Sequence, residues 1–148
     1  MVALDFIHSD RSIFKIVDLD EAWAFLNVAQ GETLSNKLVR AGRAMNAGVY
    51  FVTQSSGDVS KESLKNNIGL KFAFRSTDTN EIKQTLEFFG LDSEDENNQK
   101  RLRDLENGQC LMQDLYGRVG VVQIHPVFVE LLHAFDTRPP IKSEVDLE

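Results

Sequence analysis

Residues 14–23 read FKIVDLDEAW, and more of the interpretation depends on this segment than on any other. Its first part is rich in β-branched and aromatic residues, which predicts a strand over residues 13–19. Asp20 and Glu21 follow at once, so a mostly apolar strand ends in two adjacent carboxylates. A phosphoryl-transfer site needs one carboxylate that holds Mg²⁺, directly or through water, and a second that positions or deprotonates the attacking water. We therefore predict the metal role for Asp20 and the water role for Glu21, with a simple charge pair at a helix N-terminus as the alternative.

A second polar cluster follows the next predicted strand. The unbroken run VYFVT, residues 49–53, predicts a strand that is covered on both faces. Gln54 comes directly after it and begins a loop of polar residues and glycine. Because ligands of α/β sheets bind at the carboxyl ends of strands, Gln54 is a candidate to hydrogen-bond a γ-phosphate or the attacking water. The alternative is an ordinary strand exit that polar loop residues cap.

The order of predicted elements, β-α-α-β-α-β-α-α-β-β-α, indicates the fold class. Helices between the early strands predict parallel pairing. The dipeptide YG lies between two late strands, 109–115 and 118–124, and predicts an antiparallel hairpin. We expect an α/β fold, a three-layer partial domain whose mixed sheet has mostly parallel strands and a C-terminal antiparallel hairpin. The domain is expected over residues 1–138, with an extended tail over 139–148.

One helix of this series has clear boundaries in the sequence. Asp78, with Glu81 three residues later, fits a capping box that opens a helix. The helix is expected to stop at Gly90 and to present three apolar residues on one face, Ile82, Leu86 and Phe89.

Composition limits the classes of function. The chain has 148 residues, 23 acidic and 16 basic, with a net charge of −7, so its surface as a whole does not suit a nucleic-acid backbone. Its single cysteine, Cys110, excludes an internal disulfide and indicates a reducing compartment. No apolar run approaches the roughly 18 residues of a membrane span, and the N-terminus lacks a signal-peptide pattern. These features predict a cytoplasmic protein.

Three arginines are candidates for phosphate recognition. Arg40 and Arg43 lie three residues apart on a predicted helix over 34–45, and Arg118 lies at the predicted hairpin. Arginine suits bidentate contact with phosphate, so any of the three could stabilise transferred charge in a neighbouring subunit. The alternative for each is a solvated surface position.

Taken together, the segments resemble one family, the VirB-type ATPases of type IV secretion and conjugation, which are relatives of the HerA and FtsK translocases. Residues 14–23 are similar to the Walker B segment of that family, which often ends in Asp-Glu-Ala-Trp. Residues 40–48 resemble its arginine-bearing helix. Residues 52–55, followed by Asp58, resemble its Thr-Gln sensor segment. Residues 107–110 and 116–120 resemble its late strand pair with a Gly-Arg turn.

The resemblance spans residues 12–139 and implies a RecA-like fold and a motor function. It implies Mg²⁺ and ATP as cofactors of the intact protein, with Asp20 holding the metal, Glu21 activating water and Gln54 sensing phosphate. Arg43 or Arg118 would reach the nucleotide of a neighbour in a homohexamer. The family also implies other channel components as partners, contact with DNA through the parent protein, and a position at the cytoplasmic side of the membrane.

Two features depart from the family pattern. The sequence contains no Gly-x-x-x-x-Gly-Lys-[Ser/Thr] motif, which supplies the phosphate cradle, a lysine and a Mg²⁺ ligand. We therefore expect a C-terminal portion of a longer ATPase that, alone, neither hydrolyses ATP nor binds it tightly. Asp18 stands where the family keeps an apolar residue, and we expect it to be exposed because a neighbouring strand is missing.

Two other readings stay open. The first is a non-catalytic interaction module of a conjugation or secretion apparatus, in which Asp20 and Glu21 do no chemistry. The second is an aspartate-nucleophile phosphatase, because Asp18-Leu19-Asp20 is similar to the Asp-x-Asp of that class. That class needs Thr or Ser after the second aspartate, and Glu21-Ala22 follows here.

Overall fold

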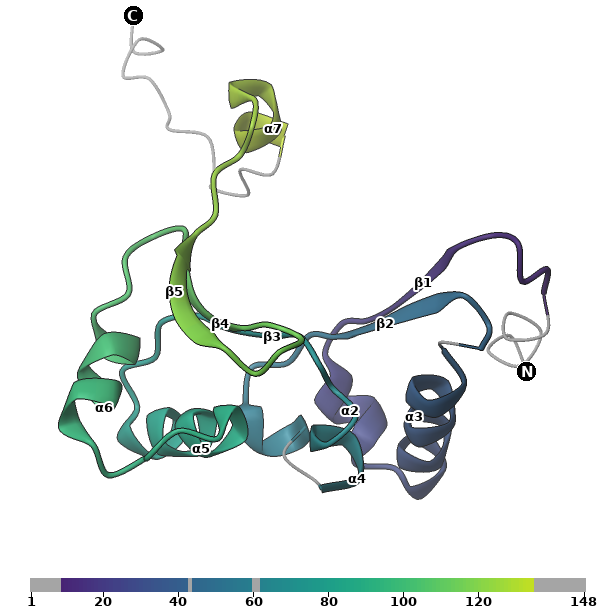
Figure 1. Cartoon of the computed structure of the whole chain (residues 1–148), viewed down its shortest axis with the longest axis horizontal. Coiled ribbons are helices and arrows are strands. Elements are labelled where there is room, and N and C mark those ends of the chain that lie inside the picture. Colours follow the sequence, from purple (N-terminus) through teal and green to yellow (C-terminus); the bar gives the residue numbers. More distant parts are fainter. Residues whose placement is uncertain (1–8, 43, 60–61, 135–148) are drawn as a thin grey trace, which may run out of the picture.

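The computed structural model describes residues 9–42, 44–59 and 62–134, and these form a mixed α/β fold (Figure 1). The described strands make two small sheets, one parallel and one antiparallel. The first sheet contains β1 (Lys15–Leu19) and β2 (Ala47–Phe51), and the second contains β3 (Lys71–Ala73), β4 (Gln109–Gln113) and β5 (Val119–Gln123) in that spatial order. The helices are α2 (Ala22–Leu26), α3 (Ala29–Gly42), the 3₁₀ helix η1 (Ser56–Val59), α4 (Glu62–Lys65), α5 (Thr79–Phe89), α6 (Glu96–Arg103) and α7 (Val129–Ala134).

The sheet arrangement confirms part of the expectation and corrects the rest. The parallel pair β1–β2 and the antiparallel hairpin β4–β5 are as predicted. The expectation of one mixed sheet with mostly parallel strands is wrong for the described residues, because β3 pairs antiparallel with β4 and not with β2. A parallel crossover normally returns the chain through a helix that covers the sheet. Between β2 and β3 the described helices η1 and α4 have only four residues each, too short to cover a sheet in this way.

Helix α5 forms where the sequence predicts it. The Asp78 side chain accepts a hydrogen bond from Glu81 N at 2.8 Å and so caps the helix. Gly90 ends it with φ 75° in the left-handed region, and Leu91 N donates to Leu86 O at 2.9 Å. The capping box is only half formed, because Asp78 N donates to Ser76 Oγ at 3.3 Å. The Glu81 carboxylate therefore has other partners, described below.

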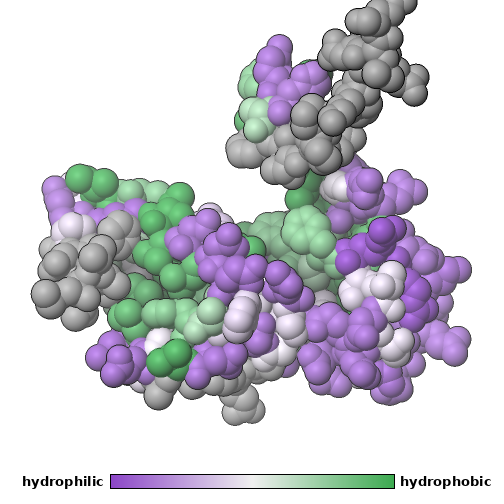
Figure 2. Space-filling view, turned by 180° about the vertical axis from the view of Figure 1, so that it is seen from behind, coloured by the Kyte–Doolittle hydropathy of each residue, from purple (hydrophilic) through white to green (hydrophobic). Residues whose placement is uncertain are grey.

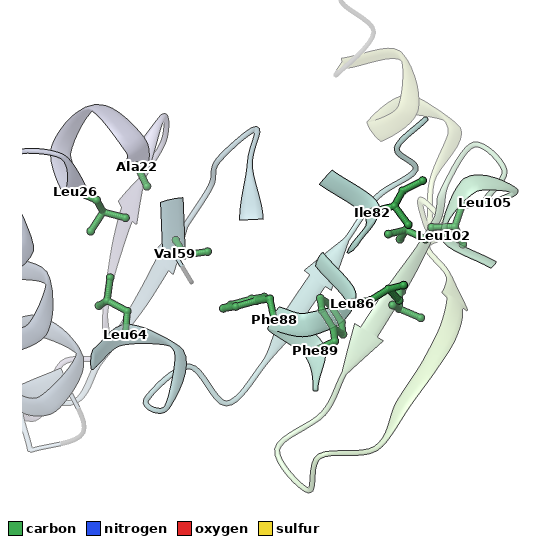
Figure 3. Close-up of a cluster of buried hydrophobic side chains, with 11 residues drawn as sticks. Ala22, Leu26, Val59, Leu64, Ile82, Leu86, Phe88, Phe89, Leu102 and Leu105 are labelled. Carbon is green, nitrogen blue, oxygen red and sulfur yellow. The ribbon is translucent and has the colours of Figure 1, made fainter. Parts of the chain in front are cut away.

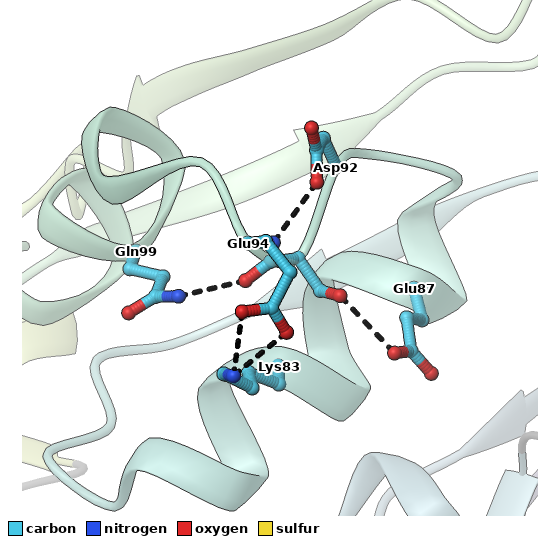
Figure 4. Close-up of polar contacts among 6 residues, drawn as sticks. Lys83, Glu87, Asp92, Glu94 and Gln99 are labelled. Atoms are coloured by element: carbon cyan, nitrogen blue, oxygen red, sulfur yellow. Dashed lines mark hydrogen bonds and ion pairs between the residues drawn. The ribbon is translucent and has the colours of Figure 1, made fainter.

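Polar contacts tie α5 to the turn that leads into α6 (Figure 4). Lys83 Nζ donates to both carboxylate oxygens of Glu94, at 2.7 and 2.9 Å. Ser93 Oγ donates to Glu87 Oε1 at 3.1 Å, and Gln99 Nε2 donates to Ser93 O at 2.7 Å. These contacts fix the angle between α5 and α6 from their exposed side.

The buried core lies mainly between α5, α6 and the neighbouring strands (Figure 3). Ile82, Leu86 and Phe89, the predicted apolar face of α5, are all buried. Figure 3 shows two groups of side chains with Phe88 between them, and the full cluster is Ala22, Leu26, Val59, Leu64, Ile82, Leu86, Phe88, Phe89, Leu102, Leu105 and Leu111. Each large side chain of this kind contributes about 1.5–3 kcal/mol when fully buried.

One face of the β1–β2 sheet is open, which corrects the expectation that residues 49–53 are covered on both faces. Ile16 is 55% exposed and Tyr50 is 50% exposed, while alternate residues point into the molecule. Asp18 lies on the same exposed face, as expected. Figure 2 shows hydrophobic residues gathered over the half of the molecule that carries β1, β2 and α3. The apolar run in β2 therefore belongs to a sheet that is covered on one face only.

Helix α7 stands away from both sheets and buries none of its residues (Figure 1). Within the described ranges, no helix combines the length and apolarity that crossing a bilayer requires.

Candidate nucleotide-site edge

The carboxyl ends of β1 and β2 meet at one edge of the parallel sheet. Leu19 lies opposite Phe51 in the register, so both strands stop at the same level. Val52 N donates to Leu19 O at 3.0 Å, and Ala22 N donates to Val52 O at 2.9 Å. These backbone bonds hold together the two segments that leave the sheet. The residues that follow each strand are therefore neighbours, as the sequence predicts.

Glu21 and Gln54 are in direct contact at this edge. Gln54 Nε2 donates to Glu21 Oε1 at 2.9 Å, although the two residues are 33 positions apart. Trp23 Nε1 donates to Glu21 Oε2 at 2.5 Å, so each oxygen of this carboxylate accepts a hydrogen bond. Glu21 N donates to Asp20 Oδ1 at 2.9 Å. The two carboxylates and the amide thus form one exposed polar cluster.

The backbone of Glu21 is unusual. Its φ of 52° and ψ of 47° place it in the left-handed region, which is uncommon for a residue with a Cβ atom. It occupies the N-cap position of α2, yet its side chain makes no capping hydrogen bond and instead meets Trp23 and Gln54. Such strain costs about 1–3 kcal/mol and often occurs at functional sites.

The loop after Gln54 is anchored by helix α5. Ser55 Oγ donates to Glu81 Oε2 at 2.8 Å, and Ser56 N donates to Glu81 Oε1 at 2.7 Å. The buried Thr85 donates through Oγ1 to Ser56 Oγ at 3.2 Å and to Glu81 Oε1 at 3.4 Å. The residue that fixes this loop, Glu81, was not among the site residues that the sequence predicts.

Trp23 and Glu81 are the two members that sequence reasoning missed. Trp23 was visible only as part of the segment 14–23, with no role assigned. Glu81 has the spacing of a capping box with Asp78, which predicts a hydrogen bond from Asp78 N. In the structure Glu81 instead accepts from Ser56 N, and Asp78 N donates to Ser76 Oγ.

The oxygen donors at this edge suit a hard cation such as Mg²⁺. Asp20 and Glu21 offer carboxylate oxygens on an exposed edge. No group of three or more potential metal-binding side chains occurs among the residues that the structure describes. Mg²⁺ commonly takes one or two carboxylates and completes its shell with water and substrate phosphates. Asp20 is the residue that would hold it.

The three candidate arginines are not brought to this edge by any recorded contact between described residues. Arg40 lies exposed in the last turn of α3, and Arg43 lies outside the described residues. Arg118 Nε donates to Asp114 Oδ2 at 2.6 Å, and its guanidinium lies 5.4 Å from the ring centroid of Tyr116. These contacts keep Arg118 within its own hairpin turn in this structure.

Comparison with known proteins places the chain in a family. Residues 1–135 match the family described as the AAA-like domain. The chain is 34% identical over 119 residues to the uncharacterized protein YddE of Bacillus subtilis (strain 168), an alignment that covers 80% of this chain and 14% of YddE. The chain thus spans a small part of the length of that relative.

A solved structure supports the same assignment at the level of the fold. The genome packaging NTPase B204 of Sulfolobus turreted icosahedral virus 2, determined in complex with ATP-gammaS, superposes with a TM-score of 0.57 and 15% sequence identity. The match covers 75% of this chain and 52% of that one. The chain belongs to the AAA-like domain family, and its fold resembles part of this NTPase.

Proposed function

We propose that the chain is the C-terminal portion of a motor ATPase of conjugative transfer or type IV secretion, which couples Mg-ATP hydrolysis to the movement of DNA or protein. The observation that carries the proposal is the 2.9 Å hydrogen bond between Gln54 Nε2 and Glu21 Oε1 at the shared edge of β1 and β2. It supports the assignment because an amide beside a carboxylate can contact a phosphate and an attacking water in one place.

Each residue of the edge has a separate task in this proposal. Asp20 would hold Mg²⁺, which when bound neutralises charge on the phosphates. Glu21 accepts a hydrogen bond from the attacking water and takes its proton or orients it. The Gln54 amide carries two hydrogens, so it can donate to Glu21 and to a phosphate oxygen together. Trp23 holds the second oxygen of Glu21 and so limits its rotation.

The remaining assignments rest on the resemblance to the VirB-type ATPases. Arg43 or Arg118 would act on the nucleotide of a neighbouring subunit in a homohexamer. For Arg118 this requires release from Asp114, and an exposed pair of this kind is worth only about 0–1 kcal/mol. The intact motor would work with other channel components at the cytoplasmic face of the membrane, and DNA contact would come through the parent protein.

We assign residues 1–138 to the NTPase domain; the boundary at residue 138 and the tail expected over 139–148 lie outside the residues that the structure describes. Because the 148 residues contain no Gly-x-x-x-x-Gly-Lys-[Ser/Thr] motif, the phosphate cradle comes from outside them. The isolated chain is expected neither to hydrolyse ATP nor to bind it tightly.

The test is ATP turnover by a complete NTPase polypeptide that contains this segment. Glu21→Gln is expected to lower kcat by about 10²–10⁴, the usual contribution of a general base. Glu94→Gln is the matched control, because that exposed carboxylate lies in the turn before α6 and pairs with Lys83, so turnover should stay unchanged. Full turnover in Glu21→Gln, with transfer intact in Asp20→Ala, would favour the non-catalytic interaction module instead.

A further inference from the structure

We propose that Glu81 is a positioning residue, which holds Gln54 against Glu21 and links this edge to helix α5. The part that Gln54 and Glu21 play in hydrolysis rests on the proposed function. The positioning itself is a property of the chain and can be tested without nucleotide.

The Glu81 carboxylate holds the two residues that directly follow Gln54. It accepts from Ser55 Oγ at 2.8 Å through one oxygen and from Ser56 N at 2.7 Å through the other. Hydrogen bonds to an ionised carboxylate are about twice as strong as neutral ones. Because both oxygens are used on consecutive residues, the path of the backbone just after Gln54 is fixed in direction as well as position.

Hydrogen bonds within residues 53–58 hold this loop in one conformation, so a contact at Ser55 and Ser56 also restrains Gln54. Thr53 Oγ1 donates to Asp58 Oδ2 at 2.7 Å, and Asp58 N donates to Ser55 O at 3.3 Å. Val59 at its end is buried in the core cluster. Gln54 lies within this closed turn. A displacement of Glu81 would therefore move the Gln54 backbone with the loop and change its distance from Glu21.

Helix α5 is in turn attached at its other end to the antiparallel sheet. Lys71 Nζ, from β3, donates to Phe88 O at 2.8 Å, and Gln113 Nε2, from β4, donates to Phe89 O at 2.9 Å. A path thus runs from Glu21 to Gln54 by a hydrogen bond, along the backbone to Ser55 and Ser56, and through Glu81 and α5 to the second sheet. The arrangement would let the state of the edge and the position of the second sheet influence each other.

A simple capping role does not account for Glu81. A capping glutamate reaches back to the N–H of the N-cap residue. Here Asp78 N donates to Ser76 Oγ, and the carboxylate of Glu81 turns toward Ser55 and Ser56, the two residues after Gln54. Its partners Ser56 and Ser55 are 25 and 26 positions away in the sequence, so these hydrogen bonds join helix α5 to a distant loop.

The experiment uses the single tryptophan of the 148-residue chain as the reporter. Trp23 Nε1 donates to Glu21 Oε2, so its indole N–H resonance in a ¹H–¹⁵N spectrum responds to the placement of that carboxylate. Gln54→Ala is expected to shift this resonance. Glu81→Ala should shift it in the same direction, and Glu81→Gln, which keeps one acceptor oxygen, by less. Glu87→Ala is the matched control on the same helix, because Glu87 contacts Ser93 and not the loop.

The possible results distinguish a role of Glu81 in positioning Gln54 from a contribution to the stability of the whole chain. An indole resonance that stays in place in Glu81→Ala, whether or not the melting temperature falls, overturns the proposal. If Glu81→Ala does not fold, the same comparison is made with Glu81→Gln. In the complete NTPase, Glu81→Ala is expected to lower kcat about tenfold with KM for ATP unchanged. Failure of the proposed function would show separately, as full turnover in Glu21→Gln, because the spectrum requires no turnover.

Discussion

Lys71 is buried and at the same time binds the carboxyl end of α5. Its Nζ donates to Phe88 O at 2.8 Å and lies 4.5 Å from the centroid of the Phe88 ring. Burial lowers the pKa of Lys71 from its ordinary value of 10.5, and the charge of Lys65 lowers it further. The ammonium therefore binds the carboxyl end of α5, but its burial destabilises the folded chain as long as Lys71 is protonated.

That cost predicts a pH dependence of stability. Between the lowered pKa of folded Lys71 and the unfolded value of 10.5, the unfolded chain binds more protons, so the free energy of unfolding rises with pH. The rise should be absent in Lys71→Met, while all other lysines remain. Urea denaturation of both proteins at intervals from about pH 8 to about pH 10.5 measures it. Equal slopes in the two proteins would contradict the assignment to Lys71.

At the scale of the element, α5 is the best-defined helix, because both of its ends are specified. Asp78 caps its start, and Gly90 ends it with a positive φ that residues with a Cβ atom rarely adopt. Its carboxyl end is also bound by Lys65, Lys71 and Gln113 side chains. The helix therefore connects the loop after Gln54 to the antiparallel sheet.

Gly90→Ala tests this termination. No atom lies within 4 Å of the added Cβ, so the cost is that of the left-handed backbone alone, about 1–2 kcal/mol of unfolding free energy. Gly120→Ala is the control, because Gly120 also has open space but no positive φ. Chemical denaturation should show a loss only at Gly90. An equal loss at both glycines would mean that α5 does not depend on this turn.

The same elements show how far sequence reasoning reaches. The meeting of Glu21 and Gln54 was predictable, because parallel strands bring their carboxyl ends to one edge whatever surrounds them. The partner of Glu81 was not, since the choice between Asp78 N and Ser56 N depends on where η1 packs. The pairing of β3 with β4 likewise joins residues that are far apart in the sequence, such as Phe72 and Met112.

For the whole molecule, the main feature is the open apolar face of the β1–β2 sheet. Ile16 and Tyr50 are at least half exposed there, and a Cβ at Gly48 would lie 3.5 Å from Phe14 Cζ, so the side chains form one surface. Exposed apolar surfaces of this kind are unusual on monomeric proteins. The buried core, in contrast, draws more of its residues from α5 than from any other element.

This distribution predicts different responses to substitution. Ile16→Thr together with Tyr50→Thr should change the free energy of unfolding by no more than about 0.5 kcal/mol for each site and reduce the binding of a hydrophobic dye. Leu86→Ala, in the core, should cost about 2–5 kcal/mol. Dye fluorescence and urea denaturation provide both measurements. A large loss of stability in the double variant would show that the face is packed.

If Glu21 and Gln54 act as one hydrolytic site, as proposed, substitutions at the two residues are coupled, and a double-mutant cycle measures that coupling. In a complete NTPase containing this segment, kcat for ATP hydrolysis is measured for Glu21→Gln, for Gln54→Ala and for the pair. Residues that act as a unit give strongly non-additive effects. The double variant is expected to be little slower than Glu21→Gln alone. A fall in kcat equal to the product of the two single effects would contradict it.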